Sequence, residues 1–113
     1  MSPIEFENYC SDYLRLKGWN SKTTKGSGDQ GIDVIACKSN VLLVIQCKLY
    51  SSPIGNSAVQ EVFAGKAFLN AHAAAVVSNQ TYTKSAIELS KKTGVLLLHF
   101  KELSKLEKIL GIS

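Results

Sequence analysis

The sequence feature that most constrains the fold is a run of five apolar residues, Val41 to Ile45. A run of this length fits one strand, and it makes the strand apolar on both faces. It therefore predicts a central strand that is covered on each side. Ile32 to Cys37 alternates just before this run, and Lys38-Ser39-Asn40 suits a tight turn. Together the two segments predict a β-hairpin.

Helical and strand-like patterns surround this hairpin. The sequence predicts a helix from Ser2 to Gly18, a short strand over 19–24, a glycine-rich loop over 25–31, a loop over 50–56, a helix over 57–70, a strand over 73–77, a helix over 83–93, a strand over 95–98 and a last helix over 103–110. A hairpin followed by alternating helices and strands favours an α/β fold of three layers, α/β/α, around a central mixed β-sheet. The 113 residues fit a single domain, 1–113.

Two helix starts carry capping patterns. Ser2 is the predicted N-cap of the first helix, with Glu5 reaching back to it. The segment Ser57-Ala58-Val59-Gln60 predicts a second capping box. In the helix that follows, the residues predicted to face the core are Val59, Val62, Phe63 and Ala67.

Charge and cysteine content limit the class of protein. A formal charge of +4 and a pI near 9.0 favour polyanionic partners such as DNA. The three cysteines are odd in number and lack C-x-x-C spacing, which disfavours a disulfide framework or a zinc site. No apolar run approaches the roughly 20 residues of a membrane span, and no signal peptide is recognised. A cytoplasmic or nucleoid-associated protein without membrane contact is expected.

Polar side chains converge at one end of the predicted hairpin. Gln46 and Lys48 are two residues apart on one strand and share a face, while Cys47 faces the core. Asp33 stands at the start of the preceding strand, which lies beside the end of its antiparallel partner. A carboxylate, an amide oxygen and an ammonium group are therefore expected to meet at one sheet edge.

This combination suits metal-assisted phosphodiester hydrolysis. Mg²⁺ prefers oxygen ligands, which Asp33, the Gln46 amide and the main-chain carbonyl of Cys47 can supply. Lys48 would orient a water molecule or offset developing charge. Glu7, on the flank of the first helix, is a candidate for a further carboxylate ligand. The alternative for Asp33 is a turn-capping role after Gly31, and for Glu7 a solvated helix flank.

The loop before Asp33 also contains Gly26, Gly28 and Gly31 in the G-x-G-x-x-G spacing. In a dinucleotide-binding site the glycines of this motif lie at the start of a helix, whereas a strand is predicted to follow them in this sequence. No nucleotide cofactor is therefore expected. The loop is predicted to lie near the active site, with Asp29 as a candidate secondary ligand.

The stretch from Gly26 to Val34, followed by Val44-Ile45-Gln46-Cys47-Lys48, resembles the catalytic motif of Mrr-type restriction endonucleases. These enzymes belong to the PD-(D/E)xK, or restriction-endonuclease-like, nuclease superfamily. The stretch from Val76 through Ala86 and the closing helix are also similar to that family. The resemblance implies that Asp33, Gln46 and Lys48 are the catalytic motif residues, and that Glu7 is the first-helix metal ligand.

The predicted function is that of a standalone endodeoxyribonuclease using Mg²⁺, or Mn²⁺ in its place. Cleavage of both strands would require a homodimer, because one site cuts one strand. The alternatives are a structure-specific nuclease of the Holliday-junction-resolvase type and an inactive DNA-binding module of the same fold. The candidate DNA-binding residues are Lys22, Lys25, Ser27, Lys66 and Lys84.

Overall fold

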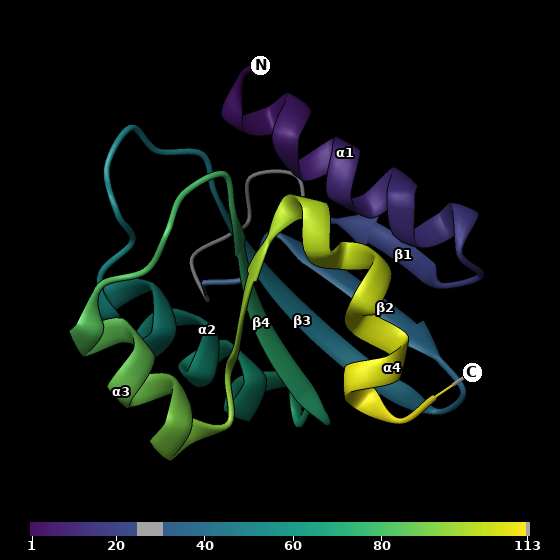
Figure 1. Cartoon of the computed structure of the whole chain (residues 1–113). Coiled ribbons are helices and arrows are strands. Elements are labelled where there is room, and N and C mark those ends of the chain that lie inside the picture. The colour runs from purple at the N-terminus through teal and green to yellow at the C-terminus, as the bar shows by residue number, and fades with distance from the viewer. Residues whose placement is uncertain (25–30, 113) are drawn as a thin grey trace.

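A mixed β-sheet between two layers of helices organises the chain in the computed structural model, which describes residues 1–24 and 31–112 (Figure 1). Over these residues the elements are α1 (Pro3–Leu16), β1 (Asn20–Thr23), β2 (Val34–Lys38), β3 (Val41–Lys48), α2 (Asn56–Leu69), β4 (Ala73–Ser78), α3 (Lys84–Thr93), β5 (Leu96–His99), the 3₁₀ helix η1 (Phe100–Lys105) and α4 (Leu106–Leu110). The predicted α/β/α architecture with a central mixed sheet is confirmed.

The strands of the described sheet follow the order β1-β2-β3-β4-β5. β2 pairs antiparallel with β1 and β3, whereas β4 pairs parallel with β3 and β5. β3 is the central strand, and Leu43 to Gln46 are buried along it. An apolar run covered on both faces is the reason for this central position.

A two-residue turn sets the register of β2 against β3. Ser39 and Asn40 have φ of 52° and 65°, and the pair Lys38↔Val41 closes the hairpin. Positive φ at both central residues is typical of the type I′ turn, whose twist matches that of the strands. The predicted tight turn is confirmed.

Each face of the sheet has its own core. On one face Leu43 and Ile45 pack with Phe6 and Leu14 of α1, and η1 and α4 join this cluster through Leu103 and Leu106. On the other face the cluster contains Val44, Val59 and Val62, among others, from β3 and α2, with Ala86 of α3. Because side chains alternate along a strand, Gln46 and Lys48 belong to the α2 face and Cys47 to the α1 face.

The start of α1 follows the capping prediction. The Ser2 hydroxyl accepts from the Glu5 N–H at 3.1 Å, and the Glu5 carboxylate accepts from the Ser2 N–H at 2.7 Å. The second capping box is wrong. α2 begins at Asn56 after the extended N-cap Gly55, so Ser57 lies inside the helix. The Asn56 amide instead donates to Ser85 Oγ of α3 at 2.7 Å, which ties the two helices together.

The predicted inward face of α2 is partly wrong. Val59 and Val62 are buried, but Phe63 is 41% exposed and Ala67 is exposed as well. The buried stripe runs through Ala58, Val59, Val62 and Gly65, and Phe63 lies about 100° around the helix from Val62.

The C-terminal helical segment begins earlier than predicted. The 3₁₀ helix η1 covers 100–105, and α4 follows only from Leu106. His99 is the N-cap of η1, and its imidazole accepts from the Lys101 N–H at 3.2 Å. Leu103 and Leu106 are buried as the apolar pattern requires, whereas Ile109 is 47% exposed. None of the described helices combines the length and apolar character needed to cross a bilayer.

Gly31 should be much less tolerant of a side chain than Gly94. Gly31 has φ +69°, and a Cβ there would lie 2.5 Å from the Glu61 carbonyl oxygen of α2. Gly94 has φ +79°, but a Cβ there meets nothing within 4 Å. We expect Gly31→Ala to lower the free energy of unfolding by about 2–4 kcal/mol, because a backbone clash adds to the left-handed strain. Gly94→Ala should lower the free energy of unfolding by only about 1 kcal/mol, because the left-handed strain acts there without a clash. Urea denaturation measures the free energy of unfolding of both variants. Equal decreases in the two variants would contradict the close approach of Gly31 to the Glu61 backbone.

Candidate active site

Asp33 lies at the end of the hairpin that carries Gln46 and Lys48. The β2–β3 ladder ends at the pair Val34↔Ile45, and the Asp33 N–H donates to the Ile45 carbonyl at 2.8 Å. Asp33 therefore lies directly beside the last residues of β3. The loops that follow β3 and β4 leave from this same end of the sheet (Figure 1). The structure thus brings Asp33, Gln46 and Lys48 to the same edge of the sheet, as the sequence predicts.

The Asp33 carboxylate is held by the main chain of β3. Its Oδ2 accepts from the Cys47 N–H at 2.8 Å. Burial raises the pKa of this carboxyl, the Cys47 hydrogen bond and the Lys48 charge lower it, and the Glu61 charge raises it further. The net pKa shift is upward, so the ionised Asp33 lacks part of the solvation it would have in water. A bound cation would supply that missing stabilisation.

Gln46 presents an unusual buried oxygen. The side chain is 4% exposed, and its Oε1 has no hydrogen-bond partner among residues 1–24 and 31–112. Leaving a buried amide oxygen unpaired is unfavourable by about 1–3 kcal/mol. A buried amide oxygen without a partner, one residue before the Cys47 N–H that holds the Asp33 carboxylate, fits the ligand preference of Mg²⁺.

Glu7 approaches the site from α1. It is partly buried, and both this burial and the negative charge of Asp33 raise the pKa of its carboxyl. The two carboxylates thus lie within electrostatic reach of each other although they come from different elements. No group of three or more His, Cys, Asp or Glu side chains forms a metal site within the described ranges. The candidate ligands are therefore mixed: Asp33, the Gln46 amide, the Cys47 carbonyl and Glu7.

The Cys47 side chain points away from this edge, as predicted. It packs against the cluster on the α1 face, next to Cys10. The neighbouring Cys10 thiol and burial raise the pKa of the Cys47 thiol well above its ordinary value. A thiol that stays protonated is a poor nucleophile, so Cys47 contributes packing and its main-chain groups.

Lys48 has two neighbours that the sequence analysis does not predict, Glu61 and Tyr50. Its Nζ lies 3.8 Å from Glu61 Oε1 of α2. It also lies 3.4 Å from the Tyr50 hydroxyl and 5.4 Å from the centroid of the Tyr50 ring. Alternation along the chain could have pointed to Tyr50, since it follows Lys48 by two residues. No sequence signal marks Glu61, because its position depends on how α2 packs on the hairpin.

The loop after β3 is tied to the loop after β4. The Tyr50 N–H donates to Asn79 Oδ1 at 3.0 Å, and Asn79 Nδ2 donates back to the Tyr50 carbonyl at 2.9 Å. Gln80 Nε2 donates to the same carbonyl at 3.2 Å. These contacts hold the Tyr50 main chain beside Lys48.

The predicted DNA-binding residues fall in different places. Lys22 is exposed on β1, where it pairs with Ile35 close to the Asp33 end of β2. Lys84 is the first residue of α3, after the loop that leaves the same sheet edge. Lys66 is in the last turn of α2, toward the other end of the sheet where β4 starts. Lys25 and Ser27, like Asp29, lie outside the described residues.

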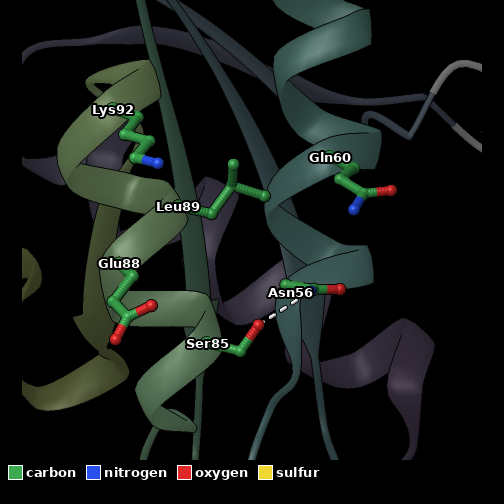
Figure 2. A pocket seen from close by; sticks show the side chains of 6 residues that line it. All are labelled: Asn56, Gln60, Ser85, Glu88, Leu89 and Lys92. Carbon is green, nitrogen blue, oxygen red and sulfur yellow. Dashed lines mark hydrogen bonds between the residues drawn. The ribbon is translucent and has the colours of Figure 1, made fainter.

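A separate hollow of about 200 Å³ lies between α2 and α3 (Figure 2). Its lining is Asn56, Gln60, Ser85, Glu88, Leu89 and Lys92. The hydrogen bond between Asn56 and Ser85 belongs to this lining, so two of its polar groups satisfy each other. The hollow contains none of Asp33, Gln46 and Lys48, and we place the candidate chemistry at the sheet edge.

The sequence profile of the Mrr catalytic domain, described as a restriction endonuclease, matches residues 1–106. Three solved structures share the fold. AF1548, a protein of unknown function, is 18% identical with a TM-score of 0.74 over 92% of this chain and 61% of that chain. The DNA modification-dependent restriction endonuclease AspBHI is 18% identical with a TM-score of 0.70, over 98% of this chain and 32% of that one.

The MspJI restriction endonuclease, solved in complex with a 27-mer oligonucleotide, is 21% identical with a TM-score of 0.64. That match covers 88% of this chain and 26% of the MspJI chain. The present chain thus spans about a quarter to three fifths of the length of these proteins. At these identities the likeness shows a common restriction-endonuclease-like fold. A search among curated proteins finds no significant match.

Replacing the Asp33 carboxylate should stabilise the metal-free protein at neutral pH. In Asp33→Asn the new amide oxygen can still accept from the Cys47 N–H, while the desolvated charge is removed. Because the folded-state pKa of Asp33 is raised, the protonated carboxyl favours the folded state. This stabilisation is fully present below about pH 3.9, the ordinary Asp pKa, and is lost as the pH rises through the folded-state pKa.

We therefore expect the melting temperature of Asp33→Asn, relative to wild type, to increase between about pH 4 and pH 7 in EDTA. The difference in melting temperature should grow in favour of Asp33→Asn as the wild-type carboxyl ionises. Differential scanning calorimetry in matched buffers gives the comparison. A variant that is less stable at pH 7, or a pH-independent difference, would show that the Asp33 charge is well satisfied without a metal.

Proposed function

Because the chain belongs to the Mrr catalytic-domain family of restriction endonucleases, we propose that it is a metal-dependent endonuclease that hydrolyses DNA phosphodiester bonds. The proposal rests on two observations at the same end of the hairpin. Gln46 Oε1 is buried without a hydrogen-bond partner among the described residues, and burial raises the pKa of the Asp33 carboxyl. A buried amide oxygen without a partner and a partly desolvated carboxylate are both unfavourable for folding, so a purely structural role does not account for them.

The proposed metal ligands are the side chains of Asp33, Gln46 and Glu7 and the main-chain carbonyl of Cys47. Their oxygen chemistry suits Mg²⁺, with Mn²⁺ able to replace it. When bound, the ion polarises the phosphate and lowers the pKa of a water molecule. Since Gln46 is neutral, the site has one negative charge fewer than a site with Glu at this position. Metal binding should accordingly be modest in strength.

Asp33 and Lys48 have different roles in the proposed reaction. Asp33 keeps one carboxylate oxygen on the Cys47 N–H, which fixes its direction and leaves the other oxygen for the cation. Lys48 places a positive charge where the phosphate oxygens gain negative charge during attack. A water oxygen forms the new bond to phosphorus and gives up a proton to the solvent. The bond from phosphorus to one sugar oxygen breaks, and that oxygen takes up a proton from the solvent. Lys48 can also orient that water, because its ammonium carries three donors.

DNA is the proposed substrate. The formal charge of +4 favours a polyanion, and Lys22 pairs with Ile35 close to the Asp33 end of β2. Lys84 is the first residue of α3, after the loop that follows β4. One site cuts one strand, so we propose that a homodimer performs double-strand cleavage. Sedimentation velocity at assay concentrations would detect that dimer.

Cleavage of labelled DNA tests the proposed function. Linear, nicked, single-stranded and four-way-junction substrates would be incubated with Mg²⁺, Mn²⁺ or EDTA. We expect metal-dependent cutting by the wild type. Asp33→Asn and Lys48→Met should each lose about 10²–10³-fold or more in rate, the loss typical when a charge-stabilising group is removed. DNA binding in EDTA should remain.

Lys91→Met provides the matched control, because it removes an exposed lysine from the last turn of α3 and leaves the edge intact. Its rate should stay within about twofold of wild type, since an exposed substitution away from the reacting groups changes little. Preferred cutting of four-way junctions would favour a structure-specific nuclease instead. DNA binding without metal and without any cleavage would refute the nuclease function and would favour an inactive DNA-binding module.

A further inference from the structure

Lys48 is held between two elements at the sheet edge. From α2, Glu61 Oε1 lies 3.8 Å from its Nζ. From the loop after β3, the Tyr50 hydroxyl lies 3.4 Å away and the Tyr50 ring centroid 5.4 Å from the ammonium. The side chain of Lys48 is 19% exposed, against 49% for that of Glu61. The ammonium is thus enclosed between an anion and an aromatic face.

The main chain on both sides of this arrangement is fixed. Asn79 bonds both the N–H and the carbonyl of Tyr50, which locks the loop. On the other side, Gly31 approaches the Glu61 backbone so closely that a Cβ would meet the Glu61 carbonyl oxygen at 2.5 Å. This backbone contact sets the distance between α2 and the segment that leads into Asp33.

The ion pair itself contributes little to stability. An ion pair at 3.8 Å whose carboxylate partner, Glu61, is half-exposed is a weak interaction in water. A lysine on a four-carbon stem has many rotamers, however, and a catalytic ammonium must occupy one of them. An anion on a rigid helix can select that rotamer without adding much to the free energy of folding.

We propose that Glu61 is a positioning residue, which holds the Lys48 ammonium from α2, opposite Tyr50, in the place where it meets the phosphate. This inference rests on the proposed nuclease function. The Glu61 charge also raises the pKa of Asp33, but the contact of its carboxylate is with Lys48. Most of the effect of its removal should therefore require Lys48 to be present. A metal ligand would behave differently, since its removal would weaken metal binding whatever residue stands at 48.

The first experiment is a double-mutant cycle in single-turnover cleavage with Glu61→Gln and Lys48→Met. Glu61→Gln alone should lower the rate at saturating Mg²⁺ about 10-fold, with the half-saturating Mg²⁺ concentration unchanged within about twofold. In the Lys48→Met background the same substitution should change the rate by no more than about twofold. Glu88→Gln, which removes an exposed carboxylate from the neighbouring helix α3, should match the wild type.

Three results would overturn the inference. Equal losses from Glu61→Gln in both backgrounds would make Glu61 independent of Lys48. A large rise in the half-saturating Mg²⁺ concentration would make it a metal ligand. An unchanged rate would leave it without a role in the reaction.

A second measurement does not depend on cleavage. The side-chain ammonium resonance of Lys48 would be followed by ¹H–¹⁵N NMR in EDTA and assigned by its absence from Lys48→Met. We expect an ordered, observable signal in wild type and in Glu88→Gln, and a broadened or lost signal in Glu61→Gln. An identical signal in all three would refute the positioning role. If the wild type cuts no DNA, the proposed function fails, while this spectrum still decides the contact.

Discussion

The hydrogen bond from the Cys47 N–H to Asp33 Oδ2, 2.8 Å long, joins the two strands of the hairpin where their ladder ends. Cys47 lies between Gln46 and Lys48, so this bond places the Asp33 carboxylate beside the part of β3 that carries both side chains. It requires the register Val34↔Ile45, which the Ser39–Asn40 turn sets at the far end of the hairpin. A slip of one residue would turn one strand's side chains to the other face. The candidate site therefore depends on a turn at the opposite end of the hairpin.

The same edge concentrates groups that folding alone does not favour. Asp33 and Glu7 both have pKa values raised by burial, and Gln46 Oε1 is buried without a partner among the described residues. Proteins tolerate such groups where function requires them and the rest of the fold offsets the loss. Here the two apolar clusters on either face of β3 provide that offset. Stability and the proposed chemistry thus make opposite demands on neighbouring residues of one strand.

Much of this architecture follows from local patterns in the sequence. The apolar run Val41 to Ile45 predicted the central strand, and alternation placed Gln46 and Lys48 on a common face, because both properties depend only on neighbouring residues. The start of α2 was misplaced because Asn56 bonds Ser85 on another helix, a contact that no local pattern contains. The exposure of Phe63 was missed since the exact rotation of a helix depends on what it packs against. Glu61 near Lys48 belongs to the same class of long-range contact.

In the proposed centre, Asp33 and Gln46 together hold a divalent cation. The most direct test is a crystal structure of the protein grown with Mn²⁺, with the ion located from its anomalous scattering. We expect an Mn²⁺ peak bonded, at about 2.0–2.4 Å, to an Asp33 carboxylate oxygen and to Gln46 Oε1. If the peak is absent, or lies elsewhere while Gln46 Oε1 stays unbound, the unpaired amide is not a metal ligand and the proposed centre is wrong.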